Sequence, residues 1–173
     1  GKIPGIDLAV GEGDVVALGA ATARVIDTPG HTAGHIVYYF AADGAAFVGD
    51  TIFALGCGRL FEGTPDQMWA SLQKIAALPP ETRLYCAHEY TQSNARFAVT
   101  VEPGNTALQR RFEEVAAKRA RGEWTVPSTL AEELATNPFL RAREESVAAV
   151  VGLEGAGPVA VFAEVRRRKD GFR

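Results

Sequence analysis

The chain has 173 residues, the length of one domain or of one domain with an appendage. Hydrophobic residues make up 47% and charged residues 23%, which is typical of a soluble globular protein and excludes a disordered chain. The 18 Lys and Arg residues against 21 Asp and Glu residues leave a net charge of −3, so no overall basic field attracts nucleic acid. The longest apolar runs are too short to span a bilayer. We therefore expect neither nucleic-acid nor membrane partners.

Runs of β-forming residues separated by turn residues predict five strands in the first half of the chain, at 15–18, 22–26, 36–40, 45–48 and 83–86. Asp43-Gly44 is a hairpin signal between the third and the fourth. A helix is predicted to begin after Thr64, which can form a capping box with Gln67, and to stop at Pro79-Pro80.

After about residue 100, helical periodicity replaces the β-forming runs. Asn105 can cap one helix, and Thr129 with Glu132 can cap another. Two more helices are expected at about 143–151 and 158–169. We therefore expect the α/β (α+β) class, with a β-rich domain at 1–100 followed by a helical domain at 101–173.

Three residues of the metal-ligand type follow predicted strands. His31 comes shortly after the second strand, Asp50 directly after the fourth and His88 directly after the fifth. Strand ends at one edge of a sheet can converge on a common site, and imidazole with carboxylate suits zinc, iron or manganese. The alternative is that each is an ordinary hydrogen-bonded loop residue, and the spacing alone leaves both open.

Other polar residues have two interpretations each. His35 lies four residues after His31, but a strand begins at once, so we expect a structural role in support of the site. Cys57 is interpreted as a small buried side chain rather than a nucleophile, and the nearby Arg59 as a solvated loop residue or an anion ligand. The cations at 166–169 either complement the dipole of the last helix or bind an anion. The two cysteines, with no CxxC pair and no signal peptide, fit the cytoplasm.

Several segments resemble a known family. Those at 28–35 (TPGHTAGH), 47–51 (FVGDT) and 86–91 (CAHEYT) resemble the later metal motifs of the metallo-β-lactamase superfamily. Those at 101–105 (VEPGN), 126–133 (VPSTLAEE), 137–139 (NPF) and 166–170 (RRRKD) resemble the C-terminal helical domain of glyoxalase II, the hydroxyacylglutathione hydrolase family. The resemblance implies the later part of an αββα sandwich followed by that helical domain.

The resemblance also implies a metal centre. His31 would ligate one divalent ion, His88 a second, and Asp50 would bridge the two and orient the attacking hydroxide. Zinc is the expected metal, with iron or manganese as alternatives. The implied reaction is hydrolysis of glutathione thioesters, such as S-lactoylglutathione to glutathione and D-lactate, by a monomer. The glutathione moiety would be held by Arg59, Tyr90, Arg166 and Lys169.

Two departures from the family pattern affect these expectations. Phe61 stands where the family usually has Tyr, so one hydroxyl donor to glutathione is absent. The motif T-H-x-H-x-D-H, which supplies four ligands in the family, is not among these residues. We therefore expect the first part of the sandwich to be missing, metal binding and hydrolysis by this chain alone to be weak, and apolar surface to be exposed.

Two other functions stay open at this point. A mononuclear iron persulfide dioxygenase of the same superfamily also uses glutathione, and two His with one Asp match the number of ligands in a facial triad. That family lacks the helical domain expected after residue 100. A non-catalytic remnant that binds glutathione derivatives without turnover is the third possibility.

Overall fold

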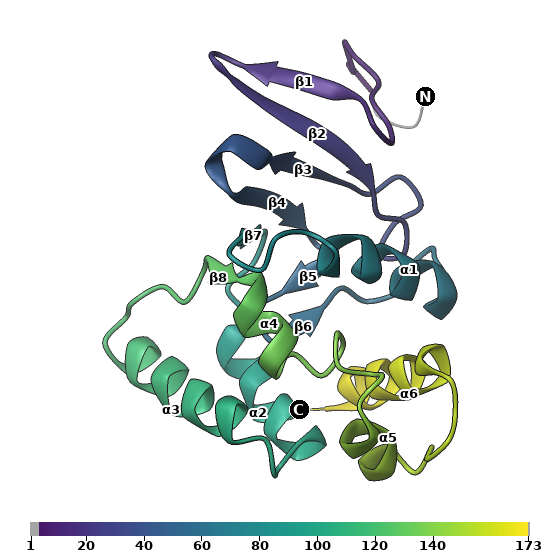
Figure 1. Cartoon of the computed structure of the whole chain (residues 1–173), viewed down its shortest axis with the longest axis vertical. Helices are drawn as coiled ribbons and strands as arrows, with labels where there is room; N and C mark the ends of the chain where they lie inside the picture. The colour runs from purple at the N-terminus through teal and green to yellow at the C-terminus, as the bar shows by residue number, and fades with distance from the viewer. Residues whose placement is uncertain (1–3, 173) are drawn as a thin grey trace.

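The computed structural model describes residues 4–172, in which a mixed sheet lies beside a group of helices (Figure 1). The six-stranded sheet has the order β1 (Val15–Leu18), β2 (Ala21–Asp27), β3 (Ile36–Phe40), β4 (Ala45–Gly49), β7 (Arg83–Cys86) and β8 (Ser128–Thr129). A separate hairpin pairs β5 (Ile52–Phe53) with β6 (Gly56–Cys57). The helices are α1 (Pro65–Ala76), α2 (Thr91–Val101), α3 (Thr106–Ala120), α4 (Leu130–Thr136), α5 (Glu145–Val151) and α6 (Pro158–Gly171). None of the helices described is long and apolar enough to cross a membrane.

The direction of the strands decides where the candidate ligands lie. β1 to β4 pair antiparallel in sequence order, whereas β4 and β7 run parallel and are connected through α1. Parallel neighbours end at the same edge of a sheet, so the residues that follow β4 and β7 come together there. Asp50 and His88 are those residues.

The predicted helix starts have the expected caps. Thr64 accepts a hydrogen bond from the backbone N–H of Gln67, whose side chain bonds back to the backbone of Thr64. Thr129 and Glu132 form the same reciprocal pair at the start of α4, and Asn105 caps α3. Each box satisfies backbone donors that a helix start otherwise leaves free, which explains why these boundaries could be predicted.

One hydrophobic core connects the sheet to the helices. Val37, Val48 and Leu84, from one face of the sheet, share a buried cluster with Leu72 of α1. The same cluster includes Phe162 of α6. Its ring packs against that of Trp69 of α1, with 6.0 Å between the ring centroids. The helical part is therefore joined to the sheet by a continuous apolar interior.

The opposite face of the sheet carries aromatic side chains. Phe47 stacks on Tyr85 at 5.0 Å between centroids and meets Phe40 edge-on at 5.7 Å. Phe47 is half exposed. Val15 and Leu18, on the edge strand β1, are more exposed than Phe47. Apolar side chains of the sheet are therefore accessible to solvent.

The sequence analysis missed α2 and three short strands. α2 follows the last predicted strand, and no element was predicted from the sequence between that strand and residue 100. Its buried positions Asn94, Ala95, Ala98 and Val101 do have helical spacing, but the polar start at 91–94 hides it. β5, β6 and β8 contain two residues each, too short to leave a periodic pattern.

Candidate metal and substrate site

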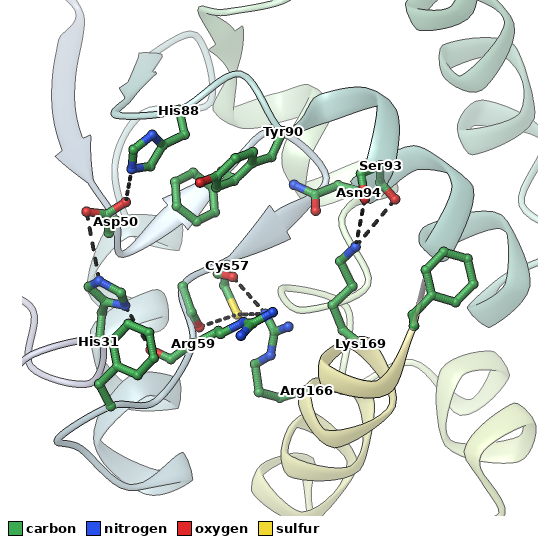
Figure 2. Close-up of a pocket in the computed structure, with 14 residues that line it drawn as sticks. His31, Asp50, Cys57, Arg59, His88, Tyr90, Ser93, Asn94, Arg166 and Lys169 are labelled. Carbon is green, nitrogen blue, oxygen red and sulfur yellow. Dashed lines mark hydrogen bonds and ion pairs between the residues drawn. The ribbon is translucent and has the colours of Figure 1, made fainter.

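A single carboxylate lies between two imidazoles at the edge of the sheet. Asp50 Oδ1 lies 3.3 Å from His88 Nε2, and Asp50 Oδ2 lies 3.9 Å from His31 Nε2 (Figure 2). The two oxygens of Asp50 thus face different histidines. The three candidate ligands predicted from strand ends therefore come together. With one oxygen near each imidazole, the carboxylate of Asp50 could contact two neighbouring cations.

The ring of His31 is oriented by the backbone. Its Nδ1 lies 2.9 Å from the carbonyl oxygen of Arg59, which can only accept, so Nδ1 carries the proton. Nε2 then presents its lone pair toward Asp50, the tautomer that metal-binding histidines commonly adopt. Gly58 allows the backbone to pass close to both Asp50 and His31. A Cβ at this position would stand 2.1 Å from the carbonyl oxygen of Asp50 and 3.1 Å from His31 Nδ1.

His35 supports Asp50 from behind. Its Nε2 accepts a hydrogen bond of 3.0 Å from the backbone N–H of Asp50, so the proton is on Nδ1, which lies 3.0 Å from Thr51 Oγ1 and 3.3 Å from Thr28 Oγ1. Burial lowers the pKa of His35, the nearby His31 lowers it further, and Asp50 opposes this. The expectation that His35 hydrogen-bonds within the protein is confirmed.

The candidate ligands open into a cavity of about 530 Å³. Its lining contains every residue that the resemblance assigned to metal or substrate: His31, Asp50, Arg59, His88, Tyr90, Arg166 and Lys169. Helix α6 supplies the last two from a point far along the chain (Figure 2). The structure thus places candidate metal ligands and candidate anion ligands in one space.

The cationic side of the cavity is built from three residues with different surroundings. Arg166 is 5% exposed, and it donates to the Cys57 carbonyl at 2.8 Å and to Asp170 at 3.0 Å, while its buried Nε has no partner. Arg59 is mostly exposed and pairs with Asp170 at 3.7 Å. Lys169 Nζ lies 3.3 Å from Ser93 Oγ. Burial lowers the pKa of Lys169, and the charges of Arg166 and Arg59 add to this effect.

Aromatic rings also line the cavity. Tyr90 stacks on His88 with 4.9 Å between centroids, and Phe53 meets Tyr90 edge-on at 5.3 Å. Phe61 tilts against His31 at 5.0 Å and is largely exposed. The sequence analysis did not identify Phe53 as part of the site, although its position three residues after Asp50 was an available signal.

The Cys57 thiol should resist alkylation in the folded chain. Burial raises its pKa to about 11, a shift that the neighbouring Arg166 opposes, and burial also raises the pKa of Cys86. Because the thiolate is the reactive form, we expect iodoacetamide to label both thiols far more slowly at pH values near neutrality than in urea-unfolded chain. Rapid labelling of Cys57 without urea, measured by mass spectrometry, would contradict its interpretation as a buried side chain.

In residues 4–172, no group of three or more His, Cys, Asp and Glu side chains has the geometry of a complete metal site. His31, Asp50 and His88 nevertheless fit a divalent ion by their chemistry. Both histidines direct Nε2 at the carboxylate, and a backbone carbonyl fixes the tautomer of one of them. They form a partial ligand set that further ligands would have to complete.

Comparisons with known proteins identify the fold of the first half of the chain. A sequence model described as "Metallo-beta-lactamase superfamily" matches residues 1–88. Two solved structures share the fold: that of ETHE1 from Myxococcus xanthus (TM-score 0.57, 24% identity, 98% of this chain and 63% of that one) and that of a metallo-beta-lactamase from Staphylococcus aureus (TM-score 0.55, 22% identity, 92% and 42%). The fold is therefore that of the metallo-β-lactamase superfamily, which implies divalent metal ions.

The second half of the chain is more specific. A model described as "Hydroxyacylglutathione hydrolase C-terminus" matches residues 89–172. Curated proteins named hydroxyacylglutathione hydrolase are 60% identical in Methylococcus capsulatus and 58% identical in Maricaulis maris, each over 99% of this chain and 67% of the relative. The chain belongs to the hydroxyacylglutathione hydrolase family.

Proposed function

We propose that this chain provides the later part of the active site of an enzyme that hydrolyses thioesters of glutathione, such as S-lactoylglutathione to glutathione and D-lactate. The observation that carries the proposal is the shared cavity, in which Asp50 and two histidines face the cations Arg59, Arg166 and Lys169. Glutathione thioesters carry carboxylates at a distance from the reacting carbonyl. A site for them therefore needs metal ligands near that carbonyl and cations near the carboxylates. The two free cysteines fit a cytoplasmic enzyme, which we expect to be a monomer.

In this proposal His31 and His88 would each contribute a ligand to a divalent ion, and Asp50 would contribute its carboxylate to both ions. Zinc suits imidazole and carboxylate ligands, and iron or manganese would be accepted by the same donors. Such ions, when bound, lower the pKa of a water molecule and polarise the thioester carbonyl. His35 keeps the backbone of Asp50 in place, and the Arg59 carbonyl keeps His31 in its Nδ1–H form.

The cations at the far side bind the glutathione carboxylates. Arg166, Lys169 and Arg59 all line the same cavity. The hydroxyl of Tyr90 supplies a further polar contact. These groups are remote from the reacting carbonyl, so they bind ground and transition states alike and act mainly on affinity.

The persulfide dioxygenase and the non-catalytic remnant are less well supported. The match of residues 89–172 to the hydrolase C-terminus favours the hydrolase over the dioxygenase. A protein that only binds glutathione derivatives needs the cations but has no need to orient Asp50 and His31. Here the Arg59 carbonyl orients His31, and His35 holds the backbone N–H of Asp50.

Replacing Arg166 or Lys169 with Ala should weaken binding of a non-hydrolysable S-alkylglutathione about tenfold or more. Each loss removes a charge-assisted hydrogen bond of about 1.5–3 kcal/mol. Isothermal titration calorimetry of the chain measures the effect. Arg167→Ala is the matched control, because Arg167 lies on the same helix but points to Glu164 in solvent. Phe61→Tyr should tighten binding. Unchanged affinity in both the Arg166 and the Lys169 variants would contradict this substrate class.

Binding of the same S-alkylglutathione should weaken with rising pH at lower values than an ordinary lysine predicts. Burial, with the charges of Arg166 and Arg59, lowers the pKa of Lys169, so its positive charge is lost at a lower pH than that of an ordinary lysine. Arginine keeps its charge throughout this range. Lys169→Arg should therefore remove the decline. Affinity that stays constant in the unsubstituted chain up to the ordinary lysine range would contradict a role for Lys169.

A further inference from the structure

The hairpin formed by β5 and β6 is held by side chains from the helical half of the chain. Asn137 Nδ2 donates to the carbonyl oxygens of Phe53 at 3.2 Å and Gly56 at 3.0 Å. Asn94 Nδ2 donates to the Ala54 carbonyl at 3.1 Å. The Leu55 N–H donates to Glu133 at 2.9 Å. The backbone of all four turn residues is thus bound from outside the hairpin.

This hairpin needs external support. Each strand has only two residues, so the pair contributes few hydrogen bonds of its own. Leu55, at its turn, has a φ of 59°, a left-handed conformation that costs a residue with a Cβ about 1 kcal/mol or more. The turn is fixed because three buried polar side chains, Asn94, Glu133 and Asn137, converge on it.

The segment that continues from the hairpin contributes to the site. The next carbonyl, that of Cys57, accepts from Arg166, and the carbonyl of Arg59 accepts from His31 Nδ1. On the other strand, the ring of Phe53 packs against Tyr90 and lies 6.0 Å from His88. The hairpin and the segment that follows it therefore contact both imidazoles.

We propose that Asn94, Glu133 and Asn137 are positioning residues: by fixing the turn at 53–56 they place the Arg59 carbonyl, which holds His31 in the Nδ1–H tautomer with Nε2 free for a metal ion. The metal part of this inference rests on the proposed function, whereas the tautomer part does not. The helical half of the chain would thus shape the candidate metal site as well as bind substrate.

The test compares Asn94→Ala and Asn137→Ala with the control Thr136→Val. Thr136 is buried on α4 and accepts from Arg111 at 2.6 Å, but it has no contact with the turn. The control also loses a buried hydrogen bond, one accepted from the charged Arg111, and should be destabilised as well. The first readout is the tautomer of His31 in long-range ¹H–¹⁵N spectra of the whole chain, well above the ordinary imidazole pKa. The second is zinc affinity by calorimetry.

We expect both Ala variants to lose the Nδ1–H signal of His31 as the dominant form and to bind zinc about tenfold more weakly, as loss of support around a ligand typically does. Thr136→Val should retain both. If Asn137→Ala does not fold, Asn94→Ala, which removes one hydrogen bond from a helix position suited to Ala, decides the matter. A folded Asn94→Ala chain with an unaltered His31 tautomer overturns the inference. Because the ligand set of this chain is partial, weak zinc binding is an expected result, and the tautomer of His31 then decides the positioning role by itself. Absence of S-alkylglutathione binding by the unsubstituted chain contradicts the proposed function and leaves that tautomer result standing.

Discussion

Replacing Asp50 with Asn should reduce zinc affinity about 100-fold or more. Both carboxylate oxygens of Asp50 face an imidazole nitrogen, and the amide removes the negative charge between them. Loss of a residue that only supports a ligand already costs about 10–100-fold in metal affinity, so loss of a ligand should reach the upper end of that range. Calorimetric titration with zinc gives the dissociation constant of the unsubstituted chain and that of the Asp50→Asn chain, which are then compared.

Asp43→Asn is the control for this change. Asp43 is exposed on the turn before β4, and its replacement alters the net charge by the same amount. It should leave zinc affinity unchanged, whereas equal affinities of the Asp50→Asn and unsubstituted chains would remove Asp50 from the metal site. The fold should tolerate the substitution, because the contact between His35 and residue 50 uses the backbone N–H.

Replacing Arg111 with Met should lower the free energy of unfolding by about 3–5 kcal/mol. Arg111 forms an ion pair with Glu133, whose side chain is completely buried. Removal of one partner leaves an uncompensated charge in the interior, which costs far more than the pair itself contributes. Small domains are stable by about 5–15 kcal/mol, so urea unfolding followed by circular dichroism should show a large shift of the midpoint.

The double variant Arg111→Met with Glu133→Gln separates charge burial from packing. Gln removes the unpaired charge while keeping an oxygen that can accept from the Leu55 N–H, so the double variant should be more stable than Arg111→Met alone. Arg121→Met, which removes an exposed pair with Glu123, should change the free energy of unfolding little, because solvent screens this pair. Equal losses in the Arg111 and Arg121 variants would contradict this account of the buried pair.

The sequence predicted features whose determinants are local. The capping boxes at Thr64 and Thr129 and the strands before Asp50 and His88 can each be recognised within a few residues, because the responsible hydrogen bonds and periodicities are short-range. The convergence of the three candidate ligands required one further rule, that strand ends meet at a sheet edge. The resemblance supplied the candidate substrate residues, which local patterns left ambiguous.

The parts that could not be predicted depend on distant partners. Glu133 bonds to Leu55 and Asn137 to Phe53, pairs separated by 78 and 84 residues. No local pattern distinguishes such an Asn or Glu from a solvated one. Arg166 is similar, because a cation near the end of a helix ordinarily faces solvent, whereas here it is buried against the Cys57 carbonyl. Only the packing of α6 beside β6 reveals this.

The parallel pairing of β4 and β7 links ion binding to folding. Asp50 and His88 meet only when these two strands are paired across α1, so an ion shared by them would bind the folded chain and not the unfolded one. By mass action, zinc at 100 times its dissociation constant would then add about 2.7 kcal/mol to the free energy of unfolding. The melting temperature would rise with the logarithm of zinc concentration, which makes thermal stability a measure of site occupancy that requires no substrate.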